Sequence, residues 1–303
     1  PSVGATENLL MAAVVAQGVT VIENAAREPE IVDLADMLCR MGARITGAGS
    51  SRIEIQGVPL ASLHPCEHVT VADRIEAGTF LVGGALMGGP VSVLGIDPSF
   101  LRMSLMKLEA MGAVVEAGQQ HITVRRTKPL VATEIQTLPH PGFPTDLQAQ
   151  FMLLAAVAQG NSVITENIFE NRFMFAAELI RMGADITIEG HHALVKGVSR
   201  LQGAPVSCTD LRAGATLVLA GISAEGTTLI HDIAHIDRGY EAYVEKLAAL
   251  GADVARVPAS LSEQDAQTLP QEPLDKAPKA SQAPSLDLPS SQGSSMKETG
   301  TTL

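Results

Sequence analysis

The six residues Leu38-Cys39-Arg40-Met41-Gly42-Ala43 recur, with small changes, three more times along the chain. Every copy has the pattern Leu-x-x-(Met/Leu)-Gly-Ala, and the later copies begin at Leu108, Leu179 and Leu247. The glycines within the four copies follow one another at intervals of 70, 71 and 68 residues. A fixed period of this kind indicates repeated structural units.

A second marker has nearly the same period. An apolar run of helical character lies upstream of each copy, and these runs end at Gly18, Gly89, Gly160 and Gly226. Their intervals are 71, 71 and 66 residues. Two independent markers with one period predict four units of about 70 residues.

The first unit can be interpreted element by element. Residues 5–18 are small and apolar almost all round, which predicts a buried helix. Apolar, β-branched residues at 19–23 predict a strand. Residues 31–41 place apolar side chains three and four apart, which predicts an amphipathic helix that Gly42 ends. Residues 44–57 alternate around a glycine-containing turn and predict a hairpin.

Each unit is therefore predicted as helix–strand–helix–strand–strand, with a further strand between units. The fold class is α/β, of the α+β type, built from these repeats. One unit alone exposes an apolar face, which only neighbouring units can cover. We therefore expect helices packed inside and sheets outside, or units layered around a local axis.

The composition of the chain limits both its fold and its partners. Of 303 residues, 46% are hydrophobic and 18% charged, so most of the chain can bury a core. Lys and Arg number 21 and Asp and Glu 33, a net charge of −12, which argues against a non-specific nucleic-acid or anionic-membrane binder. Three cysteines form no disulfide framework and favour a cytoplasmic protein. We expect no transmembrane helix, because no unbroken apolar run reaches about 18 residues.

The last part of the chain differs in composition. Residues 258–303 are rich in Pro and Ser and contain no Ile, Val, Phe or Tyr. Such a segment cannot bury enough apolar surface to offset an ordering entropy of roughly 1–2 kcal/mol per residue. We predict that it is a disordered tail.

Charged residues gather in the loop between the first strand and second helix of each unit. Arg172 and Arg238 lie there in the third and fourth units. An Arg near a helix start opposes the helix dipole, so we expect a carboxylate or phosphate to hold it. A structural acid and a substrate are equal alternatives for each Arg taken alone. Glu28 and Asp97, in the first two units, are explained equally well as helix caps.

The starts of the first helices form a second cluster. The third unit has Pro-Gly-Phe-Pro-Thr-Asp at 141–146, and the fourth has Thr-Asp-Leu-Arg at 209–212. The N–H groups of a helix start suit an anion or a sugar-nucleotide oxygen, although Thr-Asp is also an ordinary cap. The two prolines would hold Asp146 rigidly, as a general base or a hydroxyl-binding group requires.

Five motifs resemble one enzyme family. They are Ala-Arg-Glu-Pro-Glu-Ile-Val-Asp-Leu, Pro-x-Phe-Pro-Thr-Asp-Leu-Gln-Ala-Gln, Glu-Asn-Arg-Phe-Met, Thr-Asp-Leu-Arg-Ala and His-Ile-Asp-Arg-Gly-Tyr-Glu. In this order they resemble the UDP-N-acetylglucosamine enolpyruvyl transferases, or 1-carboxyvinyltransferases, which catalyse the first committed step of peptidoglycan synthesis. The resemblance runs from Pro1 to about Val257. The 3-phosphoshikimate 1-carboxyvinyltransferases share the repeat architecture but match these motifs less well.

The resemblance implies an inside-out α/β barrel in each of two domains, with three units around a pseudo-threefold axis and the active site between the domains. By this correspondence, residues 1–66 are the single remaining unit of the first domain. Residues 67–257 are the second domain with three units, and 258–303 form the tail.

The resemblance also implies a reaction. The enolpyruvyl group of phosphoenolpyruvate passes to the 3-hydroxyl of UDP-N-acetylglucosamine by addition and elimination, with release of phosphate and without a metal or cofactor. The implied catalytic residues are Asp146, which takes the hydroxyl proton, Asp210, which lies near the reacting carbon, and Arg238. The implied sugar-nucleotide contacts are Ser2, Val3, Gly4, Asp146 and Ile168. The implied phosphoenolpyruvate contacts are Arg172, Arg212 and Arg238.

The chain also departs from this family. The family's chain begins about two units before Pro1, and that part carries a Lys-Asn pair, an Arg for phosphoenolpyruvate and a mobile loop with a reactive Cys. We therefore expect this chain to be a C-terminal part that is inactive unless the missing N-terminal half, its expected partner, is supplied. We assign no catalytic role to the three cysteines. Cys39 is expected to be a packing residue of a helix with apolar neighbours, and Cys66 and Cys208 lack a His and an acid around them. A non-catalytic, UDP-sugar-binding remnant or partner module is the alternative.

Overall fold

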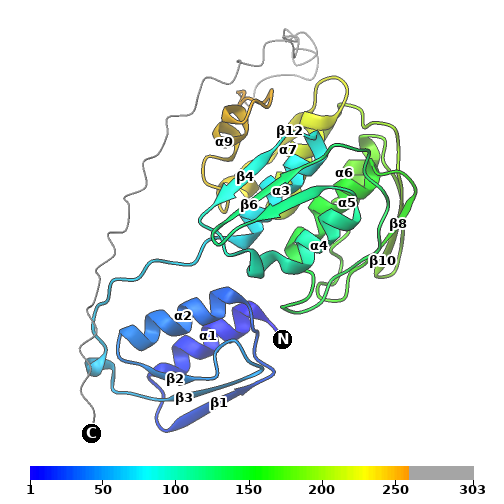
Figure 1. Cartoon of the computed structure of the whole chain (residues 1–303). Helices are drawn as coiled ribbons and strands as arrows, with labels where there is room; N and C mark the ends of the chain where they lie inside the picture. The colour runs from blue at the N-terminus through cyan, green and yellow to red at the C-terminus, as the bar shows by residue number, and fades with distance from the viewer. Residues whose placement is uncertain (259–303) are drawn as a thin grey trace, which may run out of the picture. The chain divides into compact units, whose positions relative to one another are not determined.

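The computed structural model describes residues 1–258, and its first unit has the predicted order of elements (Figure 1). These are α1 (Val3–Val14), β1 (Val19–Glu23), α2 (Pro29–Arg40), β2 (Arg44–Thr46) and β3 (Arg52–Gln56), followed by the 3-10 turn η1 (Leu60–Ser62). The three strands form an antiparallel sheet in the order β1-β3-β2. The predicted strand at 19–23 and the hairpin after Gly42 are therefore confirmed.

The next two units repeat the same order. The second contains α3 (Arg74–Met87), β4 (Val91–Leu94), η2 (Pro98–Leu101), α4 (Arg102–Ala110), β5 (Val114–Ala117) and β6 (His121–Arg125). The third contains β7 (Ile135–Gln136), η3 (Thr145–Leu147), α5 (Gln148–Ala156), β8 (Asn161–Thr165), α6 (Ala176–Arg181), β9 (Asp185–Glu189) and β10 (His192–Lys196). Their sheets have the orders β4-β6-β5 and β7-β8-β10-β9.

The fourth unit follows the pattern only in part. It contains β11 (Pro205–Ser207), α7 (Leu211–Ser223), β12 (Leu229–His231), α8 (Ala234–Asp237) and α9 (Tyr243–Ala249). The expected strands between units are present as β7 and β11, which pair in parallel with β8 and β12. Between the first and second units the expectation is wrong, because residues 57–73 contain no strand. Within the described residues, the hairpin that closes the other units does not follow α9, because residues 252–258 have no regular structure.

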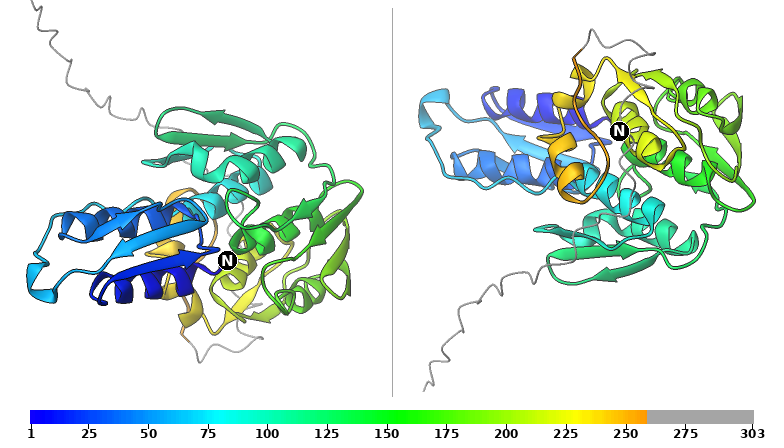
Figure 2. Two further views of the ribbon diagram at one scale, coloured as in Figure 1. Left: turned by 90° about the horizontal axis from the view of Figure 1, so that it is seen from below. Right: turned by 90° about the horizontal axis from the view of Figure 1, so that it is seen from above.

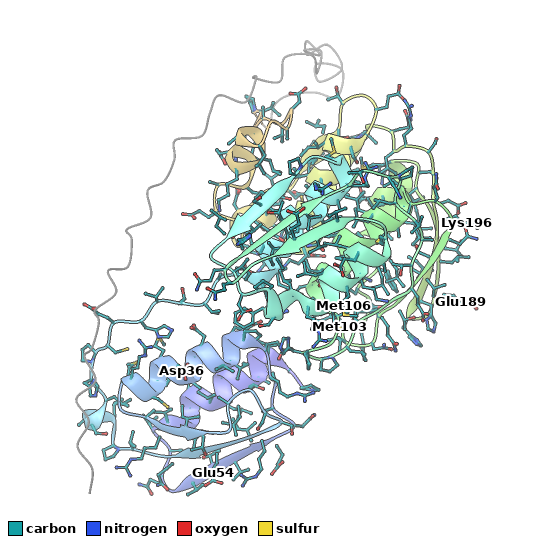
Figure 3. All side chains as sticks on the ribbon, viewed as in Figure 1. Asp36, Glu54, Met103, Met106, Glu189 and Lys196 are labelled. Atoms are coloured by element: carbon teal, nitrogen blue, oxygen red, sulfur yellow. The ribbon has the colours of Figure 1, made fainter. Side chains whose placement is uncertain are left out.

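Helices lie inside the body that spans residues 74–252, and its sheets lie outside. Helices α3, α5 and α7 pack against one another, α3 also contacts β4 and β6, and α5 contacts β8 and β10 (Figures 1 and 2). Every residue of α5 is buried as a result. Strand β10 alternates between buried and exposed residues, and Glu189 and Lys196 of the β9–β10 hairpin point outward (Figure 3). This arrangement confirms the prediction of helices inside and sheets outside.

The prediction that the first helix is buried is wrong for α1. Leu10, Ala13 and Val14 are buried in a separate core with α2 and the first sheet. Leu9 and Met11, on another face of α1, are 53% and 47% exposed. The sequence of α1 is as apolar as that of α3 or α5, but two further helices surround each of those. Burial on all sides therefore depends on neighbouring units rather than on the helix itself.

Gly42 ends α2 as predicted. Its φ is +107°, a left-handed conformation that glycine adopts without a steric penalty. The N–H of Ala43 then donates to the carbonyl of Leu38, which closes the end of the helix. The corresponding glycines of the other three copies also have positive φ, so the repeated six-residue pattern marks one turn of the backbone.

The sequence also led to expectations about transmembrane helices and about the C-terminal tail. None of the helices in the described part of the chain is long and apolar enough to cross a membrane. The predicted disordered tail at 258–303 lies, apart from Pro258, outside the described residues.

Candidate active site

Asp146 lies on the short turn η3, directly before α5. Pro144 precedes the turn, and Leu147, fully buried, anchors it to the core. The Asp146 side chain remains 39% exposed and makes no capping hydrogen bond to the helix. The prolines and the buried leucine therefore present this carboxylate at the surface, as the sequence predicts.

Two guanidinium groups share the Asp146 carboxylate. Arg172 Nη2 lies 3.0 Å from Oδ1, and Arg212 Nε lies 3.2 Å from Oδ2. Arg172 comes from the loop between β8 and α6, and Arg212 from the first turn of α7. Both Arg side chains are only 14% exposed, so the surrounding protein strengthens the attraction. Because two cations meet one anion, the group carries a net charge of +1.

Arg212 has capacity for a further hydrogen bond. Its guanidinium lies over the ring of Tyr240, 5.4 Å from the centroid. Its Nη1 is buried and finds no hydrogen-bond partner among the described residues. A buried donor of this kind costs free energy unless it is paired. Arg212 is therefore held by Asp146 and by the ring of Tyr240, with its Nη1 enclosed by the protein.

A buried polar network supports Tyr240. Its hydroxyl lies 2.9 Å from the Thr79 hydroxyl, and Gln150 Nε2 donates to that hydroxyl at 3.0 Å. Burial raises the pKa of Tyr240, which keeps the phenol neutral at physiological pH. The network joins α3, α5 and the segment after α8 directly beneath Arg212.

The acids at other helix starts behave differently from Asp146. Asp73, Asp97 and Asp210 each accept hydrogen bonds from backbone N–H groups of the following turn. The capping interpretation is therefore confirmed for Asp97, whereas Glu28 makes no capping bond and does not fit it. Among these five acids, Asp146 is the one whose carboxylate faces two guanidinium groups.

Asp210 holds the start of α7 in place. Its Oδ1 accepts from the N–H groups of Arg212 and Ala213 at 2.9 and 3.0 Å. We expect Asp210→Ala to lower the free energy of unfolding by about 1 kcal/mol, and Asp210→Asn by much less, because Asn also caps well. Denaturant titration of both variants measures this. Equal losses in the two variants would contradict the capping role.

The expected position of Arg238 at a helix start is wrong. Arg238 does not lie at a helix start: it follows α8, where the helix dipole favours a cation. The residue is exposed, and its guanidinium makes no hydrogen bond or ion pair with any described residue. Arg238 nevertheless lies near the start of α7, because a Cβ at Gly239 would come within 2.8 Å of Leu211 Cδ2.

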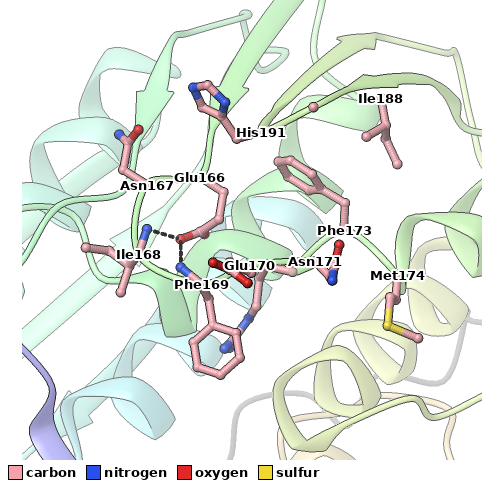
Figure 4. A pocket seen from close by; sticks show the side chains of 12 residues that line it. Glu166, Asn167, Ile168, Phe169, Glu170, Asn171, Phe173, Met174, Ile188 and His191 are labelled. Atoms are coloured by element: carbon pink, nitrogen blue, oxygen red, sulfur yellow. Dashed lines mark hydrogen bonds between the residues drawn. The ribbon is translucent and has the colours of Figure 1, made fainter.

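The loop after β8 forms one wall of a pocket of about 540 Å³ (Figure 4). Ile168, 37% exposed, and Arg172 both line it, together with Ile188 and His191 of the β9–β10 hairpin. Arg172 lies over the ring of Phe169 at 5.2 Å. The pocket thus offers a cation and apolar surface beside the Asp146 group.

Ser2, Val3 and Gly4 lie at the start of α1, and of the three Val3 packs, partly buried, against the separate core of the first unit. Ser2 caps α1 by accepting from the Ala5 N–H at 3.3 Å, and Gly4 is exposed. Among the described residues, no hydrogen bond joins these three to Asp146 or its Arg partners. The structure therefore brings together Asp146, Arg172 and Arg212, with Ile168, Asp210 and Arg238 on neighbouring segments, and does not link Ser2–Gly4 to them.

The histidines form no metal site in the described part of the chain. No group of three His, Cys, Asp or Glu side chains there could hold an ion. His191 and His192 stack with ring centroids 3.9 Å apart. Burial, reinforced by the Arg74 cation, lowers the pKa of His140, so this ring is neutral at pH 7.

The cysteines differ in exposure: Cys39 is exposed, so its expected packing role is wrong, whereas Cys208 is buried. Cys208 is 4% exposed, and burial, with Asp232 and Asp210 nearby, raises the pKa of its thiol to about 12. Because the thiolate is the reactive form, we expect iodoacetamide at pH 8 to label exposed Cys39 at least tenfold faster than Cys208. Mass spectrometry of peptides checks this, with the chain unfolded in urea as the control. Equal rates in the folded chain would contradict it.

Sequence reasoning did not single out the residues that support the site. Thr79, Gln150 and Glu166 are buried polar residues of α3, α5 and the end of β8. Their one signal was a polar side chain within an apolar element. Tyr240 lay within a quoted motif, but nothing in the sequence paired it with Arg212.

Comparison with known protein families agrees with the fold and the site. A sequence profile of the family described as EPSP synthase (3-phosphoshikimate 1-carboxyvinyltransferase) matches residues 1–247. The chain belongs to this family. The resemblance inferred from the five motifs is thereby confirmed at the level of the family.

Curated relatives carry a more specific name. The UDP-N-acetylglucosamine 1-carboxyvinyltransferase of Mycobacterium bovis is 54% identical over 257 residues, which are 85% of this chain and 61% of that protein. The enzyme of the same name from Nocardia farcinica is 55% identical and covers 85% and 60%. The chain thus spans about three-fifths of the length of these relatives.

Solved structures agree on the fold. The enolpyruvyl transferase NikO from Streptomyces tendae has a TM-score of 0.75 and 32% identity, over 83% of this chain and 60% of that one. EPSP synthase from Acinetobacter baumannii has a TM-score of 0.61 over 84% and 62%. Its identity of 22% supports the fold alone.

Proposed function

We propose that this chain is part of a UDP-N-acetylglucosamine 1-carboxyvinyltransferase that acts in the cytoplasm in peptidoglycan synthesis. Identity of 54% to curated enzymes of that name supports the choice of substrates. The observation that carries the proposal is the Asp146 carboxylate, held between Arg172 and Arg212 rather than used as a helix cap. We also propose residues 1–66 and 67–257 as parts of two domains.

The proposed reaction assigns each group a step. Asp146 takes the proton of the sugar 3-hydroxyl, and the oxygen of that hydroxyl bonds to C2 of phosphoenolpyruvate. A proton adds to C3 and later leaves, while the C2–O bond to phosphate breaks and phosphate departs. Arg172, Arg212 and Arg238 face the anionic phosphoenolpyruvate, and the net positive charge of Asp146 with Arg172 and Arg212 supports this assignment. Asp210 contributes Oδ2 near the reacting carbon, since Oδ1 caps α7.

The sugar nucleotide is proposed to contact Ser2, Val3, Gly4, Asp146 and Ile168. The pocket beside Ile168 supports one side of this site, because its Arg172 and apolar wall suit a charged ligand with a ring. A guanidinium and exposed helix N–H groups bind phosphate oxygens well.

The test measures phosphate release from phosphoenolpyruvate with UDP-N-acetylglucosamine as acceptor. We expect activity when the chain is combined with the part of the M. bovis relative that it does not cover, and little from the chain alone. The control omits the acceptor. Absence of phosphate release from the combination, with UDP-N-acetylglucosamine still bound, would favour the non-catalytic, sugar-binding alternative.

The description of the family names a different acceptor substrate. The matching profile is described as 3-phosphoshikimate 1-carboxyvinyltransferase, so 3-phosphoshikimate is the competing substrate. The same assay with this acceptor separates the two. Faster phosphate release with 3-phosphoshikimate would overturn the proposed substrate.

A further inference from the structure

Glu166 is a buried acid that the proposed reaction does not use. It follows β8 and is 4% exposed. Its Oε1 accepts from the Thr137 hydroxyl at 2.8 Å. The same oxygen accepts from the N–H groups of Ile168 and Phe169 at 2.9 and 3.0 Å (Figure 4). Its Oε2 accepts from the Thr145 hydroxyl at 2.9 Å. Four donors therefore converge on one carboxylate.

These donors come from three separate segments. Thr137 follows the edge strand β7, Thr145 begins the turn η3, and Ile168 and Phe169 lie in the loop after β8. Burying a carboxylate is costly unless hydrogen bonds compensate it, so this arrangement persists only while the donors stay in place. Glu166 thus constrains the relative positions of all three segments.

Two of these segments carry the Asp146–Arg172 pair. Thr145 immediately precedes Asp146, and the loop bound to Oε1 leads within three residues to Arg172. We propose that Glu166 is a positioning residue, which fixes the Asp146 turn and the Ile168–Arg172 loop in one geometry. Its effect on substrate binding rests on the proposed function, but its effect on the loop does not.

Two substitutions separate position from charge. Glu166→Ala removes all four acceptor contacts. Glu166→Gln keeps Oε1 for its three donors and places an NH₂ group opposite the Thr145 hydroxyl, which can accept as well as donate. We therefore expect Glu166→Gln to keep the loop in its position and Glu166→Ala to make the loop more mobile.

Glu178 provides a matched control. Its side chain is 14% exposed, accepts from the Ser207 N–H at 3.2 Å and pairs with Arg181. Glu178→Ala removes a similarly buried carboxylate that does not touch the loop. It reports any general loss of stability.

Hydrogen exchange of the Ile168 and Phe169 amides, followed by NMR on the full chain, tests the proposal. We expect Glu166→Ala to accelerate exchange at least about tenfold, and Glu166→Gln to stay within about threefold of the unmodified chain. Unchanged exchange in Glu166→Ala, or an equal rise in Glu178→Ala, would overturn the proposal.

A binding measurement tests the consequence for the site. With the complementary part of the M. bovis relative present, we expect Glu166→Ala to raise the dissociation constant for UDP-N-acetylglucosamine about tenfold and Glu166→Gln to restore it. An unchanged constant in Glu166→Ala would overturn the positioning role. If the unmodified protein does not bind UDP-N-acetylglucosamine, the proposed function fails, whereas the exchange experiment still decides the role of Glu166 in the loop.

Discussion

Replacing Asp146 by alanine is expected to lower turnover by roughly 10²–10⁴-fold, the range for loss of a general base. The enzyme for this measurement is the chain combined with the part of the M. bovis relative that it does not cover. The carboxylate leaves, but Arg172 and Arg212 remain in place. Both guanidinium groups then lose the carboxylate that pairs with them, so their charge stays available to the anionic substrate. The KM for phosphoenolpyruvate should therefore not rise. Steady-state kinetics with phosphate detection measures kcat and KM separately.

Asp97→Ala is the matched control for this substitution. Asp97 also precedes a helix, but its carboxylate caps η2 by accepting from the Ser99 N–H at 2.8 Å. Its removal should cost about 1 kcal/mol of stability and leave turnover unchanged. Unchanged turnover in Asp146→Ala would remove Asp146 from the proton-accepting role.

The largest expected effect on stability comes from Phe151→Ala. Phe151 is fully buried on α5, and its ring packs edge-on against Phe143 with centroids 4.9 Å apart. We expect a loss of about 3–5 kcal/mol in the free energy of unfolding, from lost burial and the cavity left behind. Denaturant titration followed by circular dichroism measures it.

Phe169→Ala is the control for Phe151→Ala, because the Phe169 ring is 58% exposed. Its loss should cost less than about 1 kcal/mol, including its contact with Arg172. Equal losses in the two variants would contradict the burial argument. Phe143 also belongs to the segment that leads to Asp146, so the same packing that stabilises α5 supports the site.

Local structure was largely predictable, because local forces determine it. The strand Val19–Glu23 follows from β-branched side chains, and the end of α2 follows from the conformational freedom of Gly42. The capping role of Asp97 also depends only on the next few residues. These elements need no information about distant parts of the chain.

Errors arose where distant segments decide the outcome. The apolar sequence of α1 predicted burial, yet Leu9 and Met11 are about half exposed because helices surround α3, α5 and α7 but not this face. Arg238 was expected at a helix start, but the short helix α8 forms before it rather than after it. Neither result can be derived from periodicity within one unit.

The repeat, the order of elements in the first three units and the family follow from the amino-acid sequence, because they depend on local patterns and on motifs many residues long. That Arg172 and Arg212 share Asp146, and that Glu166 accepts from four donors, depends on how the folded segments pack. Such contacts join residues between 2 and 66 positions apart in the sequence. The packing of α5 and α7 side by side brings the most distant of them together, and no local pattern encodes that distance.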